Sequence, residues 1–302
     1  MQLQHLIETQ QFDREALNRL FQLATSLENK RDESLKGLIM ASLFFAPSTR
    51  TRLSFESAMY RLGGHVISME NANENSSSTK GETIEDTIRI VDNYADVIVL
   101  RHGEVGTAAR AAAVSEVPII NAGDGVGQHP TQAFLDLYTI QREIGRTDDF
   151  HIAFVGNLAY YRTARSLAYL LAKYNNVKMT FVSGPELAMK DDVKDYLKEK
   201  GVQFEETEDL EGAMRVADVV YQTRIAEEWI PDHDQYEKLR GKYVINRPMT
   251  DQMKDGAILI HPLPRAGEIV SEVDDSPHAV YFKQAGYGVL VRMALLKTIL
   301  AK

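Results

Sequence analysis

Short apolar runs that alternate with amphipathic helical patterns constrain the fold of this chain most strongly. Nearly continuous apolar runs of this length are typical of strands buried on both faces of a parallel sheet. They lie at residues 38–45, 65–69, 96–101 and 117–122, and again at 150–156, 177–183, 219–223 and 257–261. The alternation therefore predicts an α/β protein with a doubly wound parallel sheet in each half.

Two helical patterns divide the chain. The strand–helix alternation restarts after a long pattern at residues 131–144, with helices expected at residues 159–173 and 187–200. A last pattern at residues 289–300 is apolar on one side. We expect two domains joined by interdomain helices. Residues 1–130 form the first domain, residues 131–287 form the second, and a helix within residues 288–302 packs back on the first. A chain of 302 residues is long enough for two cores.

The turn within residues 43–64 indicates a phosphate site. An apolar run ends at Pro47, hydroxyl and arginine side chains fill residues 48–52, and an amphipathic helix runs to Gly63. The apolar face of this helix is expected to carry Leu53, Phe55, Ala58, Met59 and Leu62. A helix start offers backbone N–H groups and the positive end of the helix dipole, which bind anions. A capped surface helix is the alternative interpretation. Two threonines and two arginines in one turn favour phosphate binding.

Polar side chains follow two further strands. Arg101 and His102 end the run at residues 96–101, and His129 lies in the polar segment after residue 122. Ligands of parallel α/β sheets bind outside the carboxyl ends of the strands, so Ser48, Arg101 and His129 are expected to converge. A histidine before a proline is more often a structural turn residue. The coincidence of three polar strand ends favours a binding site.

Composition excludes several classes of protein. No apolar stretch approaches the roughly 20 residues of a membrane span, and the N-terminus lacks the pattern of a secretory signal. The absence of cysteine excludes disulfides, thiolate catalysis and cysteine-ligated zinc, so the cytoplasm is the expected compartment. A net charge of −9 argues against general nucleic-acid binding, although a local basic pocket can still gather an anionic metabolite.

Two segments carry weaker signals. Residues 70–81 are polar, which indicates either a disordered surface loop or, because Lys80 ends the segment, a functional one. Residues 155–157 resemble a nucleotide-binding turn but lack the remaining glycines of G-x-G-x-x-G, so a dinucleotide site is disfavoured.

Four motifs in order resemble those of the aspartate/ornithine carbamoyltransferase family. They are Ser48–Arg52, Arg101-His102, Gly127–Gln132 and His261–Arg265, and the similarity runs from about residue 38 to the C-terminus. Within the family, the chain is more similar to the catalytic chains that use aspartate. The resemblance implies a carbamoyl-phosphate domain, an aspartate domain and a homotrimer whose active sites are shared between neighbouring subunits. It also implies carbamoyl transfer from carbamoyl phosphate to L-aspartate. Both a trimer that works alone and one that joins regulatory chains agree with the resemblance.

The resemblance also assigns roles to residues. Arg50, Thr51, Arg101 and His129 would be catalytic, and no metal or organic cofactor would be needed. Carbamoyl phosphate would contact Ser48, Thr49, Arg50, Thr51, Arg101, His129, Gln132, the backbone of Leu263, and Ser76 and Lys80 of the adjacent subunit. Aspartate would contact Lys80, Arg162, Arg224, Pro262 and Leu263.

Departures from the family pattern lie on the side of the second substrate. Ala226 stands where the family usually has glutamine, Asn157 replaces a usual aspartate, and Tyr161 replaces a small residue before Arg162. We expect a lower affinity for aspartate unless Tyr161 or another side chain compensates. An ornithine enzyme would carry a cysteine in an HCLP motif, and this chain has His261-Pro262-Leu263-Pro264. A non-catalytic scaffold homologue would have lost the phosphate residues, which are all present.

Overall fold

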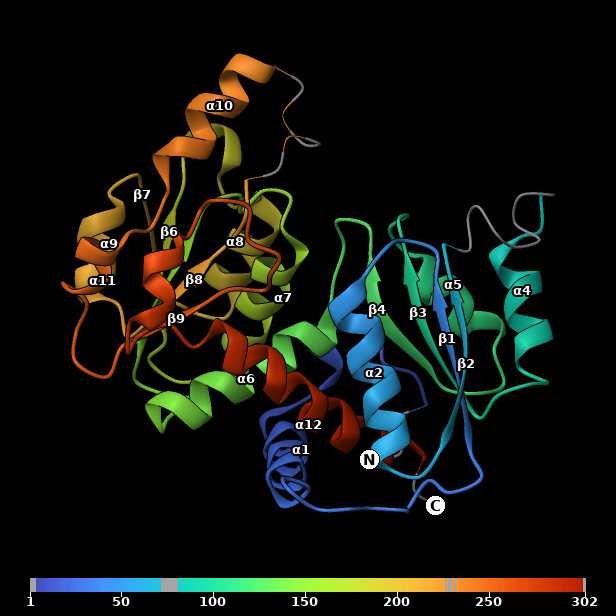
Figure 1. Cartoon of the computed structure of the whole chain (residues 1–302). Coiled ribbons are helices and arrows are strands. Elements are labelled where there is room, and N and C mark those ends of the chain that lie inside the picture. Colours follow the sequence, from blue (N-terminus) through green and yellow to red (C-terminus); the bar gives the residue numbers. More distant parts are fainter. Residues whose placement is uncertain (1–3, 72–80, 226, 228–229, 231, 301–302) are drawn as a thin grey trace. The chain divides into compact units, whose positions relative to one another are not determined.

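The chain forms two compact units, each built on one parallel sheet (Figure 1). A computed structural model describes residues 4–71, 81–225, 227, 230 and 232–300. Unit 1 comprises Met1–Leu135 and Gly286–Lys302, and unit 2 comprises Asp136–Ala285. Every strand pair of the two sheets is parallel among the described residues, which confirms the predicted fold class.

Unit 1 contains a four-stranded sheet of order β2-β1-β3-β4. Its strands are β1 (Ile39–Phe44), β2 (His65–Glu70), β3 (Val97–His102) and β4 (Ile119–Asp124). Its helices are α1 (Arg14–Ser26), α2 (Thr49–Arg61), α4 (Ile84–Val91), α5 (Thr107–Val114) and the short 3₁₀ helix η1 (Thr9–Gln11). Alternate strand residues face opposite sides of the sheet. On one side, Ala41 and Leu43 pack with Ile88 of α4 and Ala111 of α5.

Unit 2 contains a five-stranded sheet of order β7-β6-β5-β8-β9. Its strands are β5 (His151–Val155), β6 (Lys178–Val182), β7 (Phe204–Thr207), β8 (Val219–Gln222) and β9 (Ile258–Ile260). Its helices are α7 (Arg162–Leu171), α8 (Asp191–Glu199), α9 (Leu210–Val216), α10 (His233–Lys242), α11 (Arg247–Thr250), and the 3₁₀ helices η3 (Pro185–Leu187) and η5 (Ser271–Asp275).

Two helices contain the boundary between the units. The chain leaves unit 1 within α6 (Pro130–Ile144) and returns to it within α12 (Tyr281–Leu300). The second half of α12 belongs to the core of unit 1. There, the buried Arg292 guanidinium lies 5.0 Å from the Phe55 ring centroid, and Lys297 donates to Asp32 over 2.6 Å. Unit 1 therefore takes residues from both ends of the sequence.

Three helices differ from the predicted ranges. The helix expected at residues 159–173 begins at Arg162, and the one expected from residue 187 begins at Asp191 because η3 precedes it. The last helix begins at Tyr281, eight residues before the predicted start. Its apolar stripe near the end is evident, but its first two turns carry no regular apolar spacing.

Two details of the strand and helix patterns were also wrong or missed. Leu53 was expected on the apolar face of α2, but half of its surface is exposed. It lies two residues before the buried Phe55, which places the two about 200° apart around the helix. Strand β7 was not predicted because Phe204–Thr207 is a half-exposed edge strand with two central glutamates and no apolar run.

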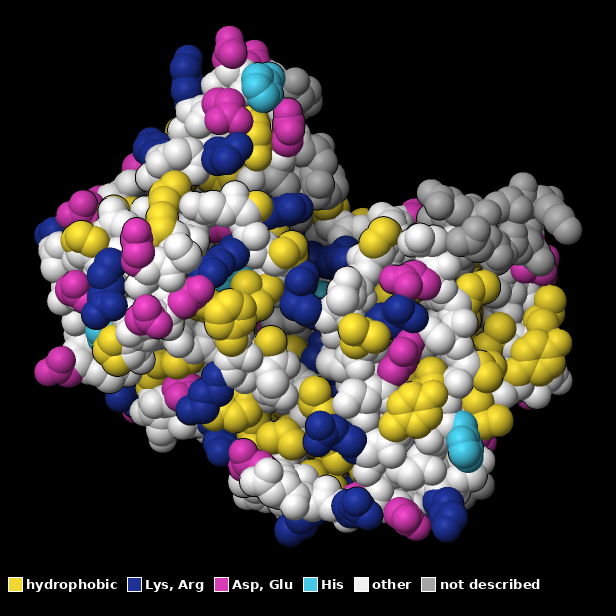
Figure 2. Space-filling view, in the orientation of Figure 1, with side chains coloured by type: hydrophobic (Ala, Val, Ile, Leu, Met, Phe, Trp, Pro, Cys, Tyr) yellow, Lys and Arg dark blue, Asp and Glu magenta, His cyan; other side chains and the backbone are white. Residues whose placement is uncertain are grey.

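Large apolar side chains are exposed on unit 1. Leu53 and Tyr60 project from α2, Ile67 from the edge strand β2, and Ile90 and Tyr94 from α4 and the turn after it, with exposed fractions between 42% and 60%. Figure 2 shows apolar side chains gathered over these elements. None of the helices in the described part of the chain combines the length and apolar character that crossing a bilayer requires.

The start of α1 allows a direct test of helix capping. Asp13 lies at the N-cap and accepts a hydrogen bond from the Ala16 amide over 2.7 Å. Asp13→Ala should lower the free energy of unfolding by about 1 kcal/mol, because that amide loses its acceptor. Asp13→Asn keeps an acceptor oxygen and should cost only a few tenths of that. Urea unfolding followed by circular dichroism measures both, and equal losses would contradict the capping explanation.

Candidate functional site

The carboxyl ends of β1 and β3 in unit 1 form a topological switch point. From β1, the chain passes to β2 on one side, and β3 pairs on the other. Ligands of open parallel sheets bind outside such a point. Phe44 at the end of β1 is in register with Arg101 on β3, and the Phe45 amide donates to the Arg101 carbonyl over 2.9 Å. The start of α2 therefore lies beside the end of β3.

The α2 start has the features of an anion site. Ser48 is the N-cap residue, with extended backbone and no side-chain capping bond, and Thr49, Arg50 and Thr51 form the first turn. The backbone amides of this turn and the positive end of the helix dipole favour a bound anion. No acidic side chain lies in the turn.

The two arginines of this turn have different environments. Arg52 binds Glu70 at 2.8 Å and lies 3.5 Å from Glu56, so its charge is balanced by carboxylates. Arg50 is exposed, whereas Arg52 is partly buried. Of the two, Arg50 is the more accessible side chain.

A threonine and a histidine from distant parts of unit 1 meet at this edge. Thr51 Oγ1 lies 3.4 Å from His129 Nε2, and both residues are buried. His129 precedes α6, and its carbonyl accepts from the Gln132 amide over 3.1 Å. Arg101 is partly buried, and its guanidinium donates to the Ala122 carbonyl over 3.3 Å. Thr51 and His129, which the resemblance assigns to one site, are thus in direct contact.

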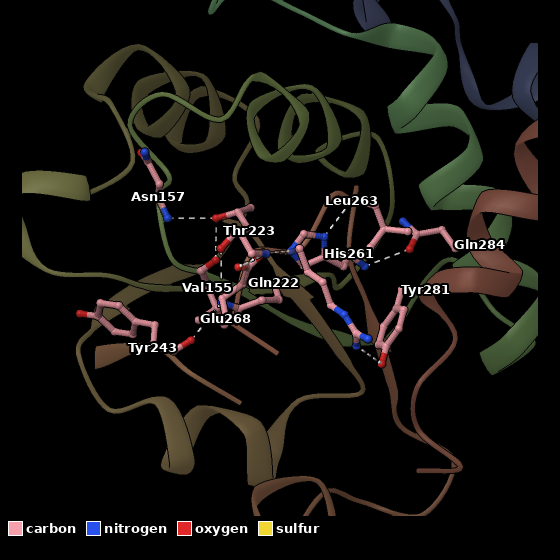
Figure 3. A network of polar contacts seen from close by, with 12 residues as sticks. Val155, Asn157, Gln222, Thr223, Tyr243, His261, Leu263, Glu268, Tyr281 and Gln284 are labelled. Atoms are coloured by element: carbon pink, nitrogen blue, oxygen red, sulfur yellow. Dashed lines mark hydrogen bonds and ion pairs between the residues drawn. The ribbon is translucent and has the colours of Figure 1, made fainter. Parts of the chain in front are cut away.

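Unit 2 has a second switch point, between β5 and β8. The Asn157 amide donates to Thr223 Oγ1 over 2.9 Å, and this hydroxyl donates to the Val155 carbonyl over 2.8 Å. Gly156 lies between them with φ +104, and a Cβ there would stand 2.6 Å from the Thr223 carbonyl oxygen. The turn after β5 is therefore tied directly to the end of β8, as Figure 3 shows.

Arg162 and Arg224, which are predicted to bind the substrate aspartate, follow these two strands. Arg162 is the first residue of α7, and Arg224 comes directly after Thr223. Tyr161 is the N-cap residue of α7. Asn157 is fully buried. Its Oδ1 accepts from the Tyr160 amide over 3.2 Å, while its Nδ2 finds no hydrogen-bond acceptor among the described residues.

The segment after β9 carries Pro262 and Leu263. His261 Nδ1 accepts from the Leu263 amide, and His261 Nε2 lies 2.7 Å from Glu268 Oε1 (Figure 3). Burial opposes ionisation of Glu268, but its hydrogen bond to His261 and the interaction with that ring hold its pKa below the ordinary value. Leu263 has φ +52, a left-handed conformation that leucine adopts only when its surroundings enforce it.

Ser76, Lys80 and Ala226 lie outside the described residues. Among the residues that are described, no three His, Cys, Asp or Glu side chains group as a metal site would require.

Comparisons with known proteins agree over nearly the whole chain. Residues 4–142 match the model of the aspartate/ornithine carbamoyltransferase carbamoyl-P binding domain, and residues 148–299 match that of the Asp/Orn binding domain. The chain belongs to the aspartate/ornithine carbamoyltransferase family.

Individual members of the family are closely similar. Aspartate carbamoyltransferase 3, chloroplastic, of Pisum sativum is 57% identical over 99% of this chain and 78% of its own length. The catalytic subunit of M. jannaschii aspartate transcarbamoylase has a TM-score of 0.91 and 49% identity, covering 98% of both chains. Aspartate transcarbamoylase of Trypanosoma cruzi in complex with carbamoyl phosphate and aspartate has a TM-score of 0.93 and 38% identity, covering 99% of this chain and 97% of that one.

Sequence patterns missed the residues that support this carbamoyltransferase site. Thr223 could have been found, because it directly precedes Arg224 at a strand end. Glu268 and Gln284 carried no local signal. Gln284 accepts from the His261 amide over 2.9 Å and donates to Asp136 over 2.6 Å, and Tyr221 donates to the same carboxylate over 3.0 Å. These partners are 7 to 148 residues apart in sequence.

His102, beside Arg101, yields a pH-dependent prediction. Its Nδ1 accepts from the Glu104 amide over 3.0 Å, and burial holds its pKa below the ordinary 6.5. Because the folded state disfavours the protonated ring, the stability contributed by neutral His102 is complete above about pH 6.5 and is lost as pH falls below it.

The His102→Asn variant isolates this effect, because Oδ1 can replace the Nδ1 acceptor without titrating. The difference in free energy of unfolding between the wild type and this variant should be constant above pH 7. As the pH falls from 6.5 to 5, the wild type should lose stability relative to the variant. Urea titrations across this range measure it, and a difference that does not vary with pH would contradict the prediction.

Proposed function

We propose that this chain transfers the carbamoyl group of carbamoyl phosphate to the amine of L-aspartate, giving N-carbamoyl-L-aspartate and phosphate. The observation that carries the proposal is the contact between Thr51 and His129 beside the α2 start, in a chain whose relatives are aspartate carbamoyltransferases. In this scheme residues 1–130, with 288–302, bind carbamoyl phosphate, and residues 131–287 bind aspartate.

The phosphate of carbamoyl phosphate binds at the start of α2. Ser48, Thr49 and Thr51 supply hydroxyl and amide donors, and Arg50 supplies a charged one. Hydrogen bonds between a cation and phosphate oxygens are shorter and roughly twice as strong as neutral ones. The phosphate is the leaving group, so these donors also stabilise the charge that it gains.

Three side chains polarise the carbonyl of the carbamoyl group. When the aspartate amine attacks the carbon, the carbonyl oxygen gains negative charge. Thr51, His129 and Arg101 are donors near this oxygen, and loss of one such donor typically costs about 3–4 kcal/mol of transition-state stabilisation. His129 is buried against Thr51, which limits the reorganisation that this step requires.

The remaining groups bind the carbamoyl NH₂ and aspartate. Gln132 and the Leu263 carbonyl accept from the NH₂ group. Arg162 and Arg224 bind the aspartate carboxylates, with the Pro262 and Leu263 backbone near the amine. Ser76 and Lys80 come from a neighbouring copy.

Since the departing phosphate can accept the proton of the amine, the scheme needs no metal or organic cofactor. Two arginines would suit the cationic side chain of ornithine poorly.

The proposed assembly is a homotrimer with active sites shared between subunits, in the cytoplasm. The exposed apolar residues Leu53, Tyr60 and Ile67, on α2 and the edge strand β2, support contact with another copy. The M. jannaschii relative is called a catalytic subunit, which is consistent with additional regulatory chains. The absence of cysteine supports a reducing compartment, whereas the pea relative is named as chloroplastic.

Replacing Arg50 tests the phosphate site. Purified protein should form N-carbamoyl-aspartate in a colorimetric assay, and Arg50→Ala should lower kcat/KM by about 100-fold or more, because a charged partner of the phosphate is lost. Arg19→Ala is the control. It removes an equal charge from an exposed pair with Glu15 on α1 and should leave activity unchanged. Near-normal turnover by Arg50→Ala would refute the phosphate-site assignment.

Mixing two inactive variants tests whether the sites are shared. Lys80→Ala and Arg50→Ala chains are each expected to be inactive as pure assemblies. After dissociation and reassembly together, some interfaces combine an intact Arg50 with an intact Lys80 of the neighbouring copy, so part of the activity should return. Mixtures as inactive as their parents, with mixed assemblies verified by mass spectrometry, would mean that each site is built from one chain.

A further inference from the structure

Side chains hold the backbone segment that follows β9. The Leu263 amide donates to His261 Nδ1 over 2.7 Å, and the Ala266 amide donates to Glu268 Oε2 over 2.7 Å. His261 and Glu268 are joined through Nε2 and Oε1, also at 2.7 Å. The two side chains thus form one buried unit, with exposed fractions of 0% and 6%, that contacts both ends of residues 263–266 (Figure 3).

This unit determines which way a carbonyl points. The peptide between Pro262 and Leu263 is planar and trans, so the Leu263 N–H and the Pro262 C=O point in opposite directions. Because the N–H is directed at the His261 ring, the Pro262 carbonyl is directed away from it. The Leu263 carbonyl belongs to the next peptide and is joined to this one through a residue with φ +52.

The hydrogen bonds also fix the state of the ring. An imidazole nitrogen that accepts from an amide carries no proton, so the proton of neutral His261 is on Nε2 and is donated to Glu268. Protonation of Nδ1 would place its N–H opposite the Leu263 N–H, and two donors cannot form a hydrogen bond with each other. Glu268 accepts at both oxygens, from His261 and from Ala266, which suits a carboxylate and not an amide.

We propose that His261, in the tautomer held by Glu268, is a positioning residue that orients the Pro262 and Leu263 carbonyls toward the substrates. The inference rests on the proposed function, in which these carbonyls contact the carbamoyl NH₂ group and aspartate. His261 touches no substrate. Its effect is exerted through the Leu263 amide.

Two substitutions at His261 separate the two ring contacts. His261→Asn keeps an acceptor near the Nδ1 position for the Leu263 amide but loses the contact with Glu268. His261→Gln keeps a donor near the Nε2 position for Glu268 but leaves the Leu263 amide without its acceptor. A buried carboxylate that loses its partner costs more stability than an amide does, so the Asn variant should have the lower Tm.

Activity should rank in the opposite order. The Asn variant should retain kcat/KM within about threefold of the wild type, and the Gln variant should lose about tenfold, the upper range for one hydrogen bond. A purely structural role for His261 predicts instead that activity follows Tm. The same ranking of the two variants in both measurements would therefore overturn the proposal.

Acetyl phosphate provides an independent measurement, because it has a methyl group where carbamoyl phosphate has NH₂. The wild type and His261→Asn should bind carbamoyl phosphate more tightly than acetyl phosphate, by about twofold to tenfold. His261→Gln should lose this preference, while inhibition by inorganic phosphate stays the same in all three. Michaelis and inhibition constants supply the comparison. A preference that survives in His261→Gln would contradict the proposal.

A matched pair of carboxylate substitutions serves as the control. Glu268→Gln cannot accept from both His261 and Ala266, so it should weaken the preference for carbamoyl phosphate. Asp218→Asn alters a carboxylate that accepts from the His151 amide over 2.8 Å at the amino end of β8, and should lower Tm without changing the preference. If the wild type itself forms no N-carbamoyl-aspartate, the proposed function fails. If it does and the control behaves like Glu268→Gln, only the positioning role fails.

Discussion

The parallel direction of the strands determines where the polar side chains of this chain lie. Because all described strand pairs run parallel, the carboxyl ends of the strands lie on the same side of each sheet. The residues that follow the strands therefore lie on that side as well. Thr51 and His129, separated by 78 residues, meet for this reason. The same constraint brings Asn157 to Thr223 in unit 2. In each sheet the contact lies at or near the point where the strand order reverses.

Buried polar contacts then fix the turns at these edges. In unit 2, Gly156 allows a close approach between the β5 turn and β8, and the Thr223 hydroxyl bridges them. His261 and Glu268 hold the segment after β9 in a similar way. A hydrogen bond inside the protein is costly to break because the group that loses its partner stays buried and unsatisfied. Turns held in this way keep backbone groups aimed in one direction, as the proposed binding of a small, planar carbamoyl group requires.

Sequence patterns predicted the sheets and the strand–turn–helix within residues 43–64 because their signals are local. Strands buried on both faces need apolar runs, and the α2 start carries its hydroxyls and arginines within one turn. β7 escaped prediction since an edge strand tolerates glutamates. The Arg50 and Arg52 side chains could not be distinguished, because the carboxylate of Glu70 that binds Arg52 comes from another strand. The pairing of His261 with Glu268 likewise depends on tertiary structure.

The discontinuity of unit 1 has a consequence for the order in which the protein forms during synthesis. Unit 2 is complete once Ala285 has left the ribosome, whereas unit 1 still lacks the end of α12. That segment supplies the buried Val291, Arg292 and Leu295 and the ion pair between Lys297 and Asp32. The strands and helices before Asp136 are therefore made first, but their core stays incomplete until the residues of α12 have been made. Unit 2 is continuous in sequence, so its folding does not depend on any residue made after it, whereas the folding of unit 1 does.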